Sequence, residues 1–192
     1  VLRSIWVGRS TGGVSRLKDG HVANFGIAEG VPEGSITSIV EDAASAIWVG
    51  TRFGLRRFVD GKWLFPVGLD HVSSDPVDSL FEDRAGNLWL ANARGLFVRP
   101  IGTEAFVGVE SDSPPVGDFA EDAAGALWAA DRTRGFRLVK GVSRLGRAHL
   151  PSTRTNGARL LVDRGNNLWV ATRGQGLLRV FADERGNPIV QH

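Results

Sequence analysis

The chain of 192 residues contains no cysteine, no methionine and no tyrosine, and it has only three lysines. The absence of cysteine excludes disulfide bonds and thiolate metal sites. No apolar run reaches the eighteen or more residues that a transmembrane helix needs, so we expect no membrane insertion by this segment. Long helical stretches rich in Ala, Leu, Glu and Lys are also scarce, which favours short strands joined by turns.

An excess of charge of one sign is missing too. The 23 basic and 21 acidic residues leave a formal net charge of +2, and arginine supplies 20 of the basic side chains. A nucleic-acid-binding protein normally carries a dense basic surface to neutralise phosphates. We therefore expect no nucleic-acid partner.

Glycine, in contrast, is abundant, at 25 residues or about twice its usual share, and it takes part in an internal repeat. Five of the six tryptophans recur at intervals of 42, 41, 39 and 41 residues: Trp6, Trp48, Trp89, Trp128 and Trp169. An aspartate stands six residues before each of the last four: Asp42, Asp83, Asp122 and Asp163. A glycine follows each tryptophan by six or seven residues: Gly13, Gly54, Gly95, Gly135 and Gly176. Because tryptophan, aspartate and glycine recur together at the same spacing, the chain contains an internal repeat of about forty residues.

Each repeat contains signals for four short strands. In the third copy, Asp83 and Gly86 suit a type I turn, in which the carboxylate caps backbone amides and glycine takes a positive φ. The strands expected around this turn cover residues 77–81, 87–91, 95–99 and 104–107. Four short strands that recur every forty residues are typical of one blade of a β-propeller.

The sequence thus predicts an all-β fold: a β-propeller of four-stranded antiparallel blades, with about five blades or partial blades over a single fragment, 1–192. Residues 5–8 form a second strand with no first strand before them, so we expect a piece of a longer protein. The favoured architecture is an arc of a larger propeller, which would expose two blade faces and associate. The alternative is a five-bladed ring in which residues 188–191 complete the first blade rather than the last.

The repeated aromatic and acidic residues have structural explanations that we prefer to functional ones. A large side chain from each second strand fills the gap between neighbouring blades, so the five tryptophans are expected to pack rather than to stack on a ligand. The aspartates are expected to cap turns rather than to act as catalytic pairs. Trp63 lies off the repeat in a fourth strand and is expected to be partly exposed at the rim.

Several segments resemble the two-component regulator propeller repeat, which reads roughly I-x-x-I-x-E-D-x-x-G-N-L-W-x-G-T-x-x-G-L-x-R. The second copy carries Ile36–Asp42, Ile47–Thr51 and Gly54–Phe58, and the segments Phe81–Trp89 and Asn167–Thr172 match almost letter for letter. Residues 26–34 resemble the family's linker between blades. The departures are local: Ser45, Ala91, Ala130, Ala171 and Asp131 replace the family's usual residues.

The resemblance implies a sensor. Propellers of this family form the extracytoplasmic part of membrane receptors, on the periplasmic or extracellular face, and are attached to histidine kinases, hybrid regulators or diguanylate cyclases. Several members respond to oligosaccharides. The implied partners are a small-molecule or oligosaccharide ligand, the remainder of the receptor chain and a second copy in a homodimer.

The candidate binding residues are arginines in the loops that join second to third strands. In a propeller these loops gather with the blade-linking loops on one face, where guanidinium groups would suit a carboxylate or sulfate. We predict an anionic or polyhydroxylated ligand at Arg9, Arg52, Arg94, Arg132, Arg134 and Arg173. The alternative is that they are solvated and paired with acids such as Asp131 or those of the linking loops: Glu29, Glu33, Asp70, Asp75, Glu110 and Asp112.

Catalytic chemistry has little support. The histidines show no metal-ligand spacing: His21, His71, His149 and His192. Glu41, Glu82 and Glu121 share one position of the repeat and are expected to be structural, although they could line the channel. We therefore predict no catalytic residue, no metal site and no cofactor. The alternative functions are a propeller lyase or hydrolase, and a protein-interaction scaffold.

Overall fold

The computed structural model describes residues 4–66, 74–111, 115–131, 135–141, 159–172, 174, 176–182 and 188–191. The chain divides into two compact units, Val1–Ser111 and Asp112–His192. Within the described ranges the regular structure is strand, apart from a single 3-10 turn, η1 (Ile27–Glu29). The all-β prediction is confirmed, and the single fragment 1–192 stays a prediction.

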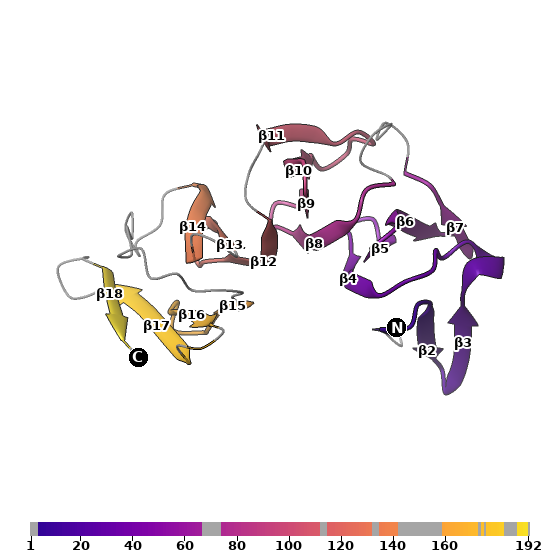
Figure 1. Cartoon of the computed structure of the whole chain (residues 1–192), viewed down its shortest axis with the longest axis horizontal. Coiled ribbons are helices and arrows are strands. Elements are labelled where there is room, and N and C mark those ends of the chain that lie inside the picture. The colour runs from indigo at the N-terminus through magenta and orange to yellow at the C-terminus, as the bar shows by residue number, and fades with distance from the viewer. Residues whose placement is uncertain are drawn as a thin grey trace. The chain divides into compact units, whose positions relative to one another are not determined.

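The first unit contains three antiparallel sheets, drawn from indigo to magenta in Figure 1. The first sheet has β1 (Ile5–Gly8), β2 (Val14–Lys18) and β3 (His21–Phe25); the second has β4 (Ile36–Glu41), β5 (Ile47–Thr51), β6 (Gly54–Val59) and β7 (Lys62–Leu64); the third has β8 (Val77–Glu82), β9 (Leu88–Asn92), β10 (Gly95–Arg99) and β11 (Val107–Ser111). Each sheet orders its strands as they follow in the chain, as a propeller blade does.

The second unit contains two more sheets of the same kind. The fourth sheet has β12 (Val116–Glu121), β13 (Leu127–Asp131) and β14 (Gly135–Lys140); the fifth has β15 (Arg159–Val162), β16 (Leu168–Ala171), β17 (Leu177–Ala182) and β18 (Pro188–Gln191). The last strand, β18, pairs with β17. The alternative in which this strand completes the first blade is therefore wrong.

One strand lies later than predicted. The fourth strand of the third blade was expected at 104–107, but β11 begins at Val107 and ends at Ser111. The preceding residues form a turn in which the Thr103 amide donates to the Pro100 carbonyl, 3.1 Å away. Phe106 then packs edge-on against Trp48, with ring centroids 5.9 Å apart, and this anchor delays the strand.

The repeated aspartates cap turns, as predicted, and they do more. Asp42 Oδ1 accepts hydrogen bonds from the amides of Ala44 and Ala46. Its Oδ2 accepts the indole N–H of Trp48 at 2.8 Å. The corresponding indole bonds recur in the next three blades, at 3.0, 3.4 and 2.7 Å from Trp89, Trp128 and Trp169. One carboxylate therefore fixes both the turn and the orientation of the tryptophan that follows it.

Blades pack in one repeated orientation. We call the side of a sheet that carries the repeat tryptophan its tryptophan face, and the other side its opposite face. Trp6 of the first blade packs against Phe58 and Trp63 on the opposite face of the second blade. Trp48 of the second packs against Leu88 and other apolar residues on the opposite face of the third. Trp63 is half-buried in the first of these junctions.

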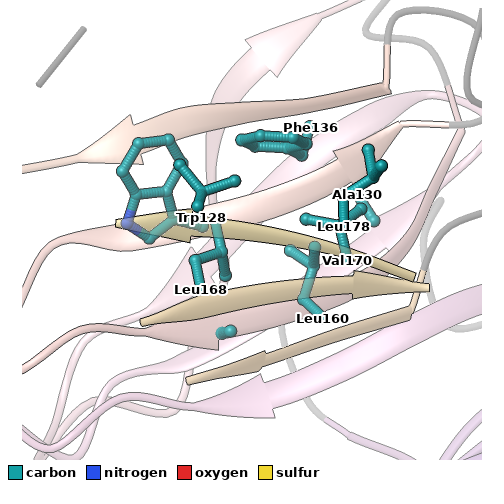
Figure 2. Packing of buried hydrophobic residues seen from close by; sticks show 9 residues of the cluster. Trp128, Ala130, Phe136, Leu160, Leu168, Val170 and Leu178 are labelled. Carbon is teal, nitrogen blue, oxygen red and sulfur yellow. The ribbon is translucent and has the colours of Figure 1, made fainter. Parts of the chain in front are cut away.

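The same arrangement recurs in the second unit. Figure 2 shows Trp128 and Phe136 of the fourth blade over Leu168 and Val170 of the fifth. Cross-strand pairing places Trp128 opposite Leu138, and Leu168 opposite Val180, so two apolar surfaces meet. The prediction that the repeat tryptophans pack between neighbouring blades is confirmed for these junctions.

A glycine two residues after the tryptophan lets two blades approach closely. A Cβ built on Gly50 would lie 2.7 Å from Cγ1 of Val77, which opens the inner strand of the third blade. A Cβ on Gly8 would lie equally close to Ile36 of the second blade, at 2.6 Å from its Cγ2. The family's glycine at this position thus reflects space between blades rather than backbone conformation.

We predict that Gly50→Ala lowers the free energy of unfolding by about 1–3 kcal/mol, because the added methyl group overpacks the junction. Gly108→Ala is the matched control, since its Cβ would only reach ordinary contact with Phe97, at 3.9 Å. Urea unfolding measures both. Equal stability of the two variants would contradict the steric explanation.

A second prediction concerns acid stability. Hydrogen bonds from the Trp169 indole and from Asn167 lower the pKa of Asp163 from 3.8 to about 2. A lowered pKa stabilises the fold above the unfolded value, and this stabilisation is lost as pH falls from about 4 to 2. Asp163→Asn should therefore weaken the pH dependence of the melting temperature between pH 5 and 2. Asp60→Asn, at an exposed turn, is the control, and unchanged pH dependence in Asp163→Asn would refute the assignment.

Candidate ligand site on the loop face

Arg9 lies in the loop between β1 and β2, and this loop is held against the linker between the first two blades. The Arg9 Nε donates to the Gly12 carbonyl at 3.1 Å. The Ile36 amide donates to the Arg9 carbonyl at 3.2 Å, and Gly12 forms a β-bridge with Glu33. The predicted gathering of a strand-joining loop with a blade-linking loop is thus present at this point.

The next strand-joining loop lies beside the same linker. Gly34 has a φ of +90°, and a Cβ there would lie 2.9 Å from the ring of Phe53 and 3.8 Å from Cβ of Arg52. Phe53 is 57% exposed although it is aromatic. Its amide donates to Oγ1 of Thr51, which holds the loop in place. An exposed ring, with Arg52 as its neighbour in the chain, therefore borders the linker.

A cavity of about 320 Å³ opens between the first of these loops and the linker. Its walls are mainly backbone and small or apolar side chains, with one carboxylate from Glu33. The lining residues are Thr11, Gly12, Gly13, Gly26, Ile27, Val31, Pro32, Glu33 and Gly34. Backbone polar groups and an apolar floor suit a small polar molecule with an apolar ring face.

Arg94 has a different environment. Its side chain forms an ion pair with Asp75 of the linker between the second and third blades. Its backbone amide donates to Oδ1 of Asn92 at 2.8 Å. Arg94 is thus paired with an acid of a linking loop, which is the alternative to ligand binding given in the sequence analysis. A ligand would have to compete with Asp75 for the guanidinium group.

The remaining predicted arginines, Arg132, Arg134 and Arg173, lie outside the described residues, so their binding role stays a prediction. Arg9 and Arg52 are the two whose loops the structure places beside one linker. The sequence did not single out Phe53, Gly34 or the cavity. The glycine-rich linker 26–34 was the feature that could have indicated the cavity.

Two further acidic side chains, Glu82 and Asp118, have structural surroundings that raise their pKa values. Glu82 lines a cavity of about 370 Å³ beside the turns of the second and third blades, and burial is the main cause that raises its pKa. Burial also raises the pKa of Asp118, whose oxygens accept the amides of Phe119 and Leu160. Asp118 thereby ties the inner strand of the fourth blade to that of the fifth.

Among the residues that the structure describes, no three His, Asp or Glu side chains lie close enough together to bind a metal ion. His21 contacts the carbonyl of Asp19, 2.9 Å away. His71, His149 and His192 lie outside the described residues. Over the same ranges, no helix has the length and apolar character needed to cross a bilayer.

Comparison of the sequence with known families agrees with this geometry. Residues 30–53 and 71–94 match the family described as two component regulator propeller. Two segments of the chain are therefore similar to two component regulator propeller repeats. The first match covers the end of the linker and the second blade up to Phe53. Phe53 and one part of the cavity lining, residues 31–34, lie in this matched segment, and the rest of the lining lies before it. No curated protein matches the sequence.

Solved structures with the same blades come from proteins of different functions. The extracellular domain of BT4673 from B. thetaiotaomicron, described as a one component system, has a TM-score of 0.74 at 22% identity, over 94% of this chain and 26% of that chain. PorZ, a surface component of the type-IX secretion system of Porphyromonas gingivalis, has a TM-score of 0.69 at 17% identity, over 92% and 31%. Virginiamycin B lyase of Staphylococcus aureus reaches 0.69 at 12% identity, over 98% and 66%.

At these identities the comparisons show a propeller fold. The repeat chain spans about a quarter of the length of the BT4673 domain. Because one of the similar structures is a lyase, the fold alone does not assign an activity, and function has to be argued from the site.

Proposed function

We propose that this chain is part of the extracytoplasmic sensor propeller of a signalling receptor, and that it binds a small anionic or polyhydroxylated molecule without catalysing a reaction. The observation that carries the proposal is the loop-face cavity, whose lining residue Gly12 accepts a hydrogen bond from Arg9, in a chain with two segments similar to two component regulator propeller repeats. The likeness to an extracellular domain of a one component system supports the extracytoplasmic location.

The chemistry of the loop face favours a sugar acid or a short oligosaccharide. A guanidinium group offers paired N–H donors that match a carboxylate, and an exposed ring packs on the apolar face of a sugar. Arg9 and Phe53 supply these two features beside the linker, and Arg52 supplies a second guanidinium group. A cavity of about 320 Å³ falls at the lower end of the usual size for small-ligand sites, so one or two sugar rings would fit.

We predict that uronic-acid oligosaccharides raise the melting temperature of the chain, because a ligand bound only by the folded state stabilises it. Neutral oligosaccharides of the same length test the contribution of the charge. A screen in which neither class shifts the melting temperature would contradict ligand binding at this face.

Single variants then locate the site. Arg9→Ala and Arg52→Ala should each weaken binding of the active oligosaccharide by roughly tenfold or more, because charge-assisted hydrogen bonds contribute about 1.5–3 kcal/mol. Arg164→Ala, an exposed arginine of a turn in the fifth blade, is the matched control and should leave affinity unchanged. Titration calorimetry measures all three. If the Arg9 and Arg52 variants both bound the oligosaccharide as tightly as the native chain does, the ligand would bind elsewhere.

The receptor part of the proposal has a separate test. A reading frame that continues beyond codon 192 into a membrane span and a kinase or cyclase domain would support it. A stop codon directly after that position would favour a scaffold or an enzyme.

A further inference from the structure

The linker between the first two blades carries two acidic side chains with different surroundings. Oε2 of Glu29 accepts the amide of Gly26 at 2.6 Å, and this bond closes the 3-10 turn η1. Glu33 is exposed, and the described part of the chain offers its carboxylate no hydrogen bond and no ion pair. Glu33 lines the loop-face cavity. Its oxygens are therefore available to accept hydrogen bonds from a molecule in that cavity.

Close backbone packing fixes the position of Glu33. Gly12, in the loop between β1 and β2, forms a β-bridge with Glu33. Gly12 has a φ of +100°, and a Cβ there would lie 3.1 Å from the amide nitrogen of Gly34. The loop and the linker thus touch through backbone atoms, which leaves the main chain of Glu33 little room to shift.

The charge that lines the cavity is negative, and a positive charge starts beside it. Of the described residues that line the cavity, Glu33 is the one with a charged side chain, and Thr11 is the one with a hydroxyl group. Gly34 is a lining residue too, and a Cβ there would lie 3.8 Å from Cβ of Arg52. The exposed ring of Phe53 meets Gly34 at the same edge.

This separation of charge decides which chemical groups suit each place. An ionised carboxylate only accepts hydrogen bonds, so it binds the hydroxyl groups of a sugar strongly. It repels a second carboxylate, and the repulsion is larger in a partly enclosed space than in open water. A site gains specificity from such repulsion as well as from attraction.

We propose that Glu33 determines the specificity of this cavity: an uncharged sugar ring enters it with hydroxyl groups on the Glu33 carboxylate, and the acidic group of the same ligand stays outside, beside Arg52 and Phe53. The preferred ligand is then an oligosaccharide with an uncharged terminal ring next to a uronate ring. This assignment rests on the proposed function, because it orients a sugar acid in the same site.

The test uses disaccharides of glucose and of galactose, each in three forms: with no carboxylate, with a carboxylate on one ring, and with a carboxylate on both rings. Titration calorimetry measures their affinities for the full chain. The native chain should bind the one-carboxylate form most tightly. The two-carboxylate form should bind about tenfold more weakly, because one of its carboxylates has to approach Glu33.

Glu33→Gln should change two affinities in opposite directions. Binding of the two-carboxylate form should strengthen by about tenfold, because the repulsion is removed. Binding of the uncharged form should weaken by about three- to tenfold, because charge-assisted hydrogen bonds become neutral ones. A gain in affinity does not arise from a damaged fold, so the opposite signs separate specificity from a structural role.

Glu29→Gln is the matched control. It removes the same charge from the same linker, and glutamine keeps an oxygen that can accept the amide of Gly26. All affinities should equal those of the native chain. A measurement on the native chain alone adds to the variants: salt should narrow the gap between the one- and two-carboxylate forms, because it screens the attraction to Arg52 and the repulsion by Glu33.

Two results would overturn the role of Glu33 and leave the proposed function standing. The first is a native chain that binds the two-carboxylate form most tightly. The second is a Glu33→Gln variant that ranks the probes as the native chain does. If the native chain bound none of the probes, the proposed function itself would fail, and the role of Glu33 would fail with it.

Discussion

The packing of each tryptophan face on the opposite face of the next blade is the contact on which the rest of the structure depends. A single four-stranded sheet has two apolar sides and cannot bury both by itself, so its stability comes from its neighbours. The carboxylate that accepts the indole N–H sets the direction of the tryptophan, and the same carboxylate ends the turn before it. Turn, strand and junction are thereby specified by two residues six positions apart.

Most of the fold could be predicted because its signals recur. Five copies of Trp and Gly and four of Asp predicted the blades. The glycines that open the third strands all take positive φ, as Gly54 does at 106°. Ser45 takes the turn position with a φ of 62° although the family prefers glycine there. The late start of β11 could not be predicted, because it depends on Phe106 reaching a ring in another blade.

The candidate site was harder to predict because loops do not repeat as strands do. Arg9, Arg52 and Arg94 lie in the same loop of the repeat, yet the first belongs to a loop bonded to a linker, the second lies beside an exposed ring, and the third is paired with Asp75. Each outcome depends on the linker that happens to lie opposite. Spacing in the sequence specifies where these side chains start, and the partner from a distant segment decides what each of them is free to bind.

The ion pair between Arg99 and Asp42 couples two repeats. Arg99 of the third blade lies 2.8 Å from the carboxylate of the second blade, both side chains are almost fully buried, and the guanidinium group lies 5.0 Å from the centre of the Trp48 ring. If the third blade unfolded alone, the Asp42 carboxylate would lose its ion-pair partner, and the Trp48 indole would lose the guanidinium group that packs on it. Amide hydrogens of both blades should then exchange with solvent through one shared opening event, so this pair behaves as a single cooperative unit rather than as two independent repeats.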